Sequence, residues 1–275
     1  TASARKPRRH RLSRTPFVGL DRPAIGRLLS LTYNQLSKGL ISIMNKIFPF
    51  IVCLVVWISP IQADTIAMIG TGDVGGALGP EFAALGHSVI YGSRNPDSEK
   101  VVALVGRTGH GAKAAKPVDA VAQAEIVVLA VPGMLVEEIV TGLGDFAGKI
   151  IIDPTNPLAR RDDGKLGILT DRSNAEIIQA AAPGAYVVKA FNTLGWRTMV
   201  DPESTGGPVS IPLVGDSNEA KSKVAEIVAA MGLEPIDVGP LRNARHVEGL
   251  SVLLLNNALG GGPNFEFYLR QHQAQ

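Results

Sequence analysis

Residues 65–94 read TIAMIGTGDVGGALGPEFAALGHSVIYGSR, and this stretch decides the fold. An apolar run at residues 66–69 leads into Gly70, Gly72 and Gly75, which have the spacing G-x-G-x-x-G. A helical pattern follows and ends at Gly86, and a second apolar run occupies residues 89–91. The order strand, tight turn, helix, strand is typical of the βαβ unit that binds the pyrophosphate of a dinucleotide.

The glycine spacing gives each glycine a physical role. Gly70 permits the tight turn, Gly72 lets a diphosphate approach the backbone, and Gly75 lets the helix lie close to the sheet. The helix, which we expect to begin near Asp73, offers free N–H groups and the positive end of its dipole to phosphates. The predicted phosphate contacts are Gly70, Thr71, Gly72, Asp73, Val74 and Gly75. A purely structural glycine turn is the alternative, and the flanking strands argue against it.

The end of the second strand indicates which dinucleotide binds. An NAD-binding unit usually has Asp or Glu about 20 residues after the glycines, where the carboxylate binds the ribose hydroxyls. Here that place reads Gly92, Ser93, Arg94 and Asn95, without an acid. Arg94 is expected to bind the 2′-phosphate, and Ser93 and Asn95 to donate hydrogen bonds to it, which favours NADP(H) over NAD(H) by about ten- to a hundredfold. The alternative is that Arg94 is a solvated loop cation.

Composition bounds the possible functions. The chain has 275 residues and is 45% hydrophobic, enough for one large domain or for one domain and a small partner. Its net charge of +2 hides two unlike parts, because residues 1–43 carry +8 and the part from Asp64 onward carries −7. An acidic folded part argues against nucleic acid as a partner. The only cysteine, Cys53, precedes that part, so no disulfide is expected in it.

Two N-terminal segments precede the glycine-rich stretch. Residues 1–43 are Arg-rich and contain no Met, and we interpret them as disordered or as upstream translated sequence. Residues 44–63 read MNKIFPFIVCLVVWISPIQA, with an apolar run at 47–58 and Ala63 at a small-residue cleavage position. This pattern predicts a cleaved signal peptide and therefore an exported or periplasmic protein. An uncleaved membrane anchor and a cytoplasmic location are the alternatives.

Strand and helix patterns alternate through the rest of the chain. Strands are expected at residues 126–131, 149–153, 186–191, 209–215 and 234–238, and helices at 96–105, 118–123, 134–143, 173–181, 218–231 and 241–259. Residues 106–116 are expected to form a loop with a short strand, and residues 160–165 a charged loop. This alternation predicts an α/β fold, a Rossmann-type doubly wound parallel sheet. We assign residues 64–200 to an NADP-binding domain and residues 201–275 to a small C-terminal helical and mixed region for substrate binding and dimerisation.

In such a sheet, ligands bind beyond the carboxyl ends of the strands. The nicotinamide should therefore lie near residues that follow the later strands: Ala130, Val131, Pro132, Asn156, Ala190 and Asn192. Some of these prolines and turns would serve equally well as structural strand stops. The helix at residues 241–259 is apolar nearly all round, so it should be buried in the core or in a subunit contact, and a homodimer through the C-terminal helices is expected.

With these pieces assembled, residues 65–269 resemble the NADP oxidoreductases that depend on the deazaflavin coenzyme F420. The matching runs, in order, are IGTGDVGGAL, YGSRNP, LAVP, DPTNP, VVKAFNTL, VGD and DVGPLRNARHVE. The region is also similar to the oxidoreductase domain of the six-transmembrane metalloreductases. Pyrroline-5-carboxylate reductase shares only the N-terminal fold, so an imine reductase of that type is disfavoured.

The resemblance implies an NADP(H)-dependent oxidoreductase that transfers hydride between the nicotinamide C4 and a flat redox acceptor, with coenzyme F420 as co-substrate. A flavin, a quinone or a ferric chelate as acceptor, and a non-catalytic NADP sensor, are the alternatives. No catalytic acid or base is assigned. Lys189 and His246 are the nearest candidates, against a snorkelling strand lysine and a helix-surface histidine. Arg242 and Arg245 are candidates for binding an acidic tail, and no metal site is expected.

Overall fold

The computed structural model describes residues 63–271, and there the glycine-rich stretch folds as predicted. Strand β1 (Thr65–Ile69) is followed by helix α2 (Asp73–Ala84) and strand β2 (Ser88–Gly92). The predictions for residues 1–43 and for 44–62 lie outside the described residues. Within residues 63–271, no helix is both long and apolar enough to span a membrane.

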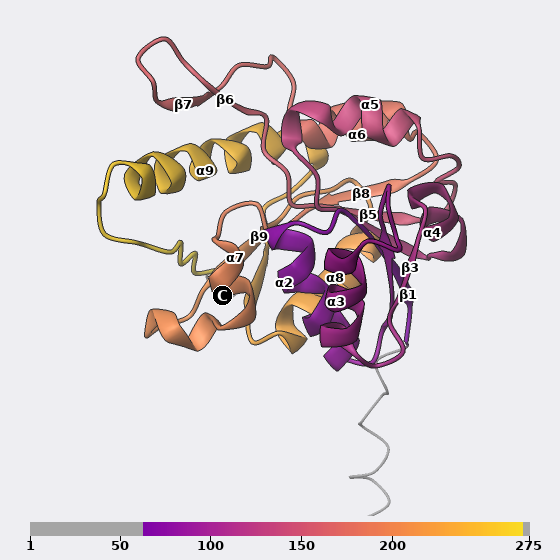
Figure 1. The fold of residues 1–275 in the computed structure, drawn as a ribbon. Coiled ribbons are helices and arrows are strands. Elements are labelled where there is room, and N and C mark those ends of the chain that lie inside the picture. The colour runs from indigo at the N-terminus through magenta and orange to yellow at the C-terminus, as the bar shows by residue number, and fades with distance from the viewer. Residues whose placement is uncertain (1–62, 272–275) are drawn as a thin grey trace, which may run out of the picture. The chain divides into compact units, whose positions relative to one another are not determined.

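One six-stranded parallel sheet organises the molecule (Figure 1). Its strand order is β3-β2-β1-β4-β5-β8, the Rossmann order, in which β2 and β3 are added on one side of β1 and β4, β5 and β8 on the other. The other strands are β3 (Lys113–Ala115), β4 (Ile126–Leu129), β5 (Ile150–Asp153) and β8 (Tyr186–Lys189). The prediction of a doubly wound α/β fold is confirmed.

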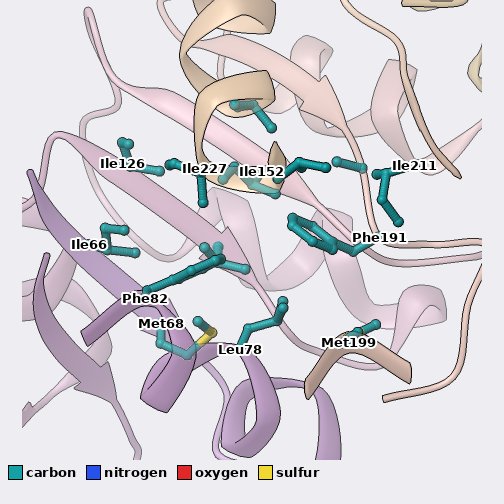
Figure 2. Close-up of a cluster of buried hydrophobic side chains, with 14 of the residues drawn as sticks. Ile66, Met68, Leu78, Phe82, Ile126, Ile152, Phe191, Met199, Ile211 and Ile227 are labelled. Carbon is teal, nitrogen blue, oxygen red and sulfur yellow. The ribbon is translucent and has the colours of Figure 1, made fainter. Parts of the chain in front are cut away.

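Helices cover both faces of this sheet (Figure 1). On one face lie α2, α3 (Glu99–Thr108) and α8 (Asn218–Ala230), and on the other lie α4 (Pro117–Gln123), α5 (Val136–Thr141) and α6 (Asn174–Ala181). Successive residues of an apolar strand point alternately into two hydrophobic cores: in β1, Ile66 and Met68 face the first core, whereas Ala67 and Ile69 face the second. Figure 2 shows the first core, where Phe82 of α2 and Phe191 meet at a ring centroid distance of 6.3 Å. Burial on both faces explains the unbroken apolar runs.

The chain after β8 adds a second, smaller sheet. This part of the chain begins with α7 (Trp196–Val200) and a 3-10 turn η2 (Pro202–Thr205). The strands β9 (Ser210–Leu213) and β10 (Glu234–Asp237) then form the smaller sheet, in which they pair in parallel and are connected by α8. A β-bridge between Lys189 and Val214, the residue that follows β9, connects this part of the chain to β8 at the edge of the large sheet. The boundary at residue 200 therefore stays a prediction.

Two local predictions need correction. The helix expected at residues 96–105 begins at Glu99, because residues 95–98 form a turn in which the Ser98 hydroxyl and N–H both donate to the Asn95 carbonyl. The charged loop at residues 160–165 is the tip of an antiparallel hairpin of β6 (Leu158–Arg160) and β7 (Leu166–Ile168). The helix predicted from Ser173 is confirmed, since α6 has a full capping box with Glu176.

The long C-terminal helix is only half buried. The turn η3 (Leu241–Asn243) leads into α9 (Ala244–Leu259), whose buried residues are Ala244, Val247, Glu248 and Ser251 in its first half. In its second half, Leu253 is 59% and Leu259 is 62% exposed. Burial of the whole helix within the chain is therefore wrong, and burial in a subunit contact stays a prediction.

Candidate functional site

A cavity of about 620 Å³, here called the main cavity, lies beyond the carboxyl ends of β1, β2 and β4. Its volume is typical of ligand sites. Nine of the predicted binding residues line it: Gly70, Thr71, Gly72, Ser93, Arg94, Asn95, Ala130, Val131 and Pro132. Three segments that are separate in the sequence thus meet around one space. The pairing of β1 with both β2 and β4 brings them together.

Three glycines shape the turn between β1 and α2. Gly70 has φ +111°, and a Cβ there would lie 2.1 Å from the Ala130 carbonyl oxygen. A Cβ at Gly75 would lie 2.1 Å from the Gly70 oxygen. In contrast, a Cβ at Gly72 would meet nothing within 4 Å. Gly70 and Gly75 are therefore required by the fold, whereas the space in front of Gly72 is open to a ligand.

Asp73 and Val74 contribute differently from the residues of the main cavity. Asp73 is exposed at the first turn of α2 and, with Thr71 and Gly72, lines a neighbouring cavity of about 460 Å³ between α2, α3 and α7. The Val74 side chain packs against the first core, so only its backbone faces the turn. The glycine turn thus separates two adjoining cavities.

One hydrogen bond within the loop after β2 and one from the loop to β3 fix the position of its backbone. The Asn95 N–H donates to the Ser93 hydroxyl oxygen at 3.2 Å, and the Ser93 N–H donates to the Ala115 carbonyl of β3 at 3.0 Å. Arg94 is exposed at the cavity. A guanidinium on a fixed loop at the end of β2 is suited to binding a phosphate.

Asn156, Ala190 and Asn192 do not line the main cavity. The Asn156 amide donates to the Asn192 carbonyl, and the Asn192 amide donates to the Asn156 Oδ1, both at 3.0 Å. Asn192 also donates to the Val247 carbonyl of α9 at 3.2 Å, and Ala190 is fully buried. Phe191, between them, has φ +63°, so the chain turns sharply after β8. Asn192 thus joins the end of β8 to α9, and contact of these three residues with the nicotinamide stays a prediction.

Beside this amide pair, three charged side chains are fully buried. The Lys189 Nζ lies 2.7 Å from Asp153 Oδ2 and 2.7 Å from Glu248 Oε1, and it donates to the Thr155 carbonyl at 2.6 Å. Burial raises the pKa of Glu248 above its usual value, although Lys189 opposes this shift. The cluster Asp153, Lys189 and Glu248, here called the buried ion cluster, fastens α9 to β5 and β8.

The buried ion cluster overturns one interpretation of Lys189. The side chain does not snorkel to solvent, since it is 0% exposed. His246 is exposed on α9, and Arg245, also exposed, pairs with Glu176 at 3.4 Å. Neither Lys189 nor His246 lines the main cavity, so the structure brings neither of these two candidates to it.

Sequence reasoning missed part of the cavity wall. Pro117, Leu135, Glu138, Ile139 and Leu143 also line it, from the start of α4, the turn η1 (Gly133–Leu135) and α5. Leu135 and Ile139 are four residues apart, which places them on one face of a helical segment, and this spacing was the available signal. In residues 63–271, no group of three or more His, Cys, Asp or Glu side chains is arranged to hold a metal ion.

The fold and the glycine turn are those of Rossmann-type dinucleotide-binding domains. A model of the family described as NADP oxidoreductase, coenzyme F420-dependent, matches residues 65–157. The F420-dependent NADP reductase of Methanothermobacter thermautotrophicus is 31% identical over 206 residues, which cover 70% of this chain and 88% of that protein. The chain therefore belongs to this family of NADP-dependent oxidoreductases.

Two further similarities bear on function. Metalloreductase STEAP3 of Rattus norvegicus is 32% identical over 197 residues, which cover 71% of this chain but 38% of that protein. This chain thus spans well under half the length of the metalloreductase it matches. The solved structure of a candidate F420-dependent NADP-reductase from Arthrobacter sp. FB24 has a TM-score of 0.70 and 31% identity, covering 76% of this chain and 100% of that one.

Proposed function

We propose that this protein binds NADP(H) and transfers hydride between the nicotinamide C4 and a flat redox acceptor such as coenzyme F420. The observation that carries the proposal is the cavity in which the open space at Gly72 lies between the α2 turn and the Arg94 loop. The residues fit the cofactor, because Gly72 lines the cavity and a Cβ there would meet no protein atom within 4 Å, which leaves room for a diphosphate to approach the backbone. Similarity to the F420-dependent NADP reductase supports the choice of acceptor.

The protein's part in this reaction is to bind and orient. The N–H groups at the start of α2 bind the diphosphate, and Arg94, Ser93 and Asn95 bind the 2′-phosphate. Ala130, Val131 and Pro132 form the wall toward the nicotinamide, and the amide pair Asn156 and Asn192 holds the loops beyond it. When bound, NADPH supplies the hydride, and ring-to-ring transfer requires no side-chain acid in contact with the reacting atoms.

A second acceptor class has its own support. The similarity to metalloreductase STEAP3 favours a ferric chelate as the electron acceptor. A flavin or a quinone is a further flat acceptor that the same arrangement would serve. A sensor that binds NADP without turnover would use the same cavity. Turnover with one acceptor and not the others distinguishes these three functions.

Two further proposals concern assembly and location. The exposed second half of α9, with Leu253 and Leu259, supports a homodimer through the C-terminal helices. The apolar run at residues 47–58 supports export or membrane anchoring. Size-exclusion chromatography with light scattering and N-terminal sequencing of the native protein test these two proposals.

The experiment that tests the proposed function is a titration of the full chain with NADPH and with NADH, followed by oxidation of the bound NADPH. The oxidants are coenzyme F420, a flavin, a quinone and ferric citrate, each in a separate reaction. We expect NADPH to bind about ten- to a hundredfold more tightly than NADH and F420 to be reduced fastest. Binding without turnover of any acceptor would indicate the sensor, and absence of NADPH binding would refute the proposed site.

A further inference from the structure

The loop that carries Arg94 is fastened by a lysine from the junction between β3 and α4. The Lys116 Nζ donates a hydrogen bond to the Arg94 carbonyl oxygen at 2.7 Å. Lys116 follows β3 directly, and β3 pairs with β2 so that Gly92 lies beside Ala115. The pairing of these two strands therefore brings a second cation to the residue predicted to bind the 2′-phosphate.

Lys116 keeps capacity for a ligand. Its ammonium group has three N–H donors, and the bond to Arg94 uses one of them. Among residues 63–271, no carboxylate lies within ion-pair distance of its Nζ, and the side chain is exposed. Lys189 in the buried ion cluster, by contrast, is surrounded by three oxygen partners.

The negative charge of a 2′-phosphate exceeds the positive charge of one arginine side chain. A phosphate monoester carries about −1.5 to −2 charges at pH 7, so one guanidinium leaves it incompletely neutralised. The Lys116 ammonium lies 2.7 Å from the Arg94 carbonyl oxygen, and its neighbour Pro117 lines the cavity, so it is a second positive charge close to the loop. NADH has no 2′-phosphate, so this contribution distinguishes the two cofactors.

We propose that Lys116 is a specificity-determining residue for the 2′-phosphate of NADP(H), acting together with Arg94. This inference rests on the proposed function, in which the Arg94 loop binds that phosphate. Lys116 orients the loop through the Arg94 carbonyl and directs its free N–H donors to the phosphate oxygens.

The test compares full-length variants by NADPH and NADH titration. In Lys116→Met we expect NADPH to bind about five- to thirtyfold more weakly, while NADH changes less than about twofold. Lys116→Arg, which keeps both the charge and the hydrogen-bond donor, should retain the preference within about threefold. Lys113→Met is the matched control, because Lys113 is an exposed lysine at the start of β3, opposite Ile90 and away from the loop.

Each other outcome overturns the inference. Equal weakening of NADPH and NADH in Lys116→Met would mean that the lysine only supports the loop. An effect of the same size in Lys113→Met would indicate a general charge effect. If the unsubstituted protein does not prefer NADPH, the proposed function fails together with the inference. If it does and Lys116→Met keeps that preference, the inference alone fails.

Discussion

The main cavity and the buried ion cluster lie at the same carboxyl edge of one sheet, yet they treat polar groups in opposite ways. At the cavity, Arg94 and the space before Gly72 are open. In the cluster, Lys189 is 0% exposed and has protein partners for all its donors. The difference is α9, which covers the ends of β5 and β8 with Glu248. At the strand ends that α9 does not cover, the cavity stays open.

Removal of the buried cation should have the largest effect on stability. Lys189→Met leaves Asp153 and Glu248 buried without their counter-ion, so we expect a loss of about 3–5 kcal/mol in the free energy of unfolding. Lys223→Met is the control, because Lys223 pairs at 3.0 Å with Asp64 at a partly exposed position and should cost about 1 kcal/mol or less. Urea unfolding measures both, and losses of equal size would contradict the difference between the two ion pairs.

Two glycines of the cavity should separate folding from binding. Gly70→Ala should lower the free energy of unfolding by about 2–4 kcal/mol, because of its positive φ and the Ala130 carbonyl. Gly72→Ala should lower the free energy of unfolding by less than about 1 kcal/mol but should weaken NADPH binding about tenfold or more. Urea unfolding and NADPH titration of the two variants measure this. A stable Gly72→Ala protein with unchanged NADPH affinity would show that the open space is not the phosphate site.

Reversal of the charge on the loop should change cofactor choice with little effect on folding. Arg94→Glu should abolish the NADPH preference, a change of about ten- to a hundredfold in the ratio of the two affinities. Arg172→Glu, an equal charge change at an exposed position before α6, should leave the ratio within about twofold. Titration with both nucleotides measures the ratio, and an unchanged ratio in Arg94→Glu would remove Arg94 from the site.

The smallest effect concerns the pH dependence of stability. Burial raises the pKa of Glu248 above the usual 4.5, so the folded protein retains a proton that the unfolded chain has lost. The contribution of Glu248 to the free energy of unfolding is complete below pH 4.5 and is lost as the pH rises through the folded-state pKa. The free energy of unfolding falls over this range by at most about 1.4 kcal/mol per pH unit. In Glu248→Gln, the free energy of unfolding should fall less steeply as the pH rises over this range, as urea unfolding at several pH values measures. A variant that declines as steeply as the unsubstituted protein would contradict this role.

Local pattern predicted most of the fold. The β1, α2 and β2 boundaries, the Ser173 capping box and the alternation of strands follow from interactions between residues close in sequence. The hairpin of β6 and β7 was missed, because the Asn256 side chain of α9 exchanges hydrogen bonds with both backbone groups of Leu166. That contact joins distant segments and leaves no signal in the local sequence.

The sequence by itself determined the glycine turn, the loop after β2 that has no Asp or Glu, and the burial of both faces of the sheet. Glycine spacing, residue types and continuous apolar runs can each be read from neighbouring residues. Only the tertiary structure decided which charged groups became partners. Strand pairing placed Lys116 beside Arg94, and the path of α9 placed Glu248 on Lys189. The physical reason is that burial and ion pairing depend on which strand ends a distant helix covers.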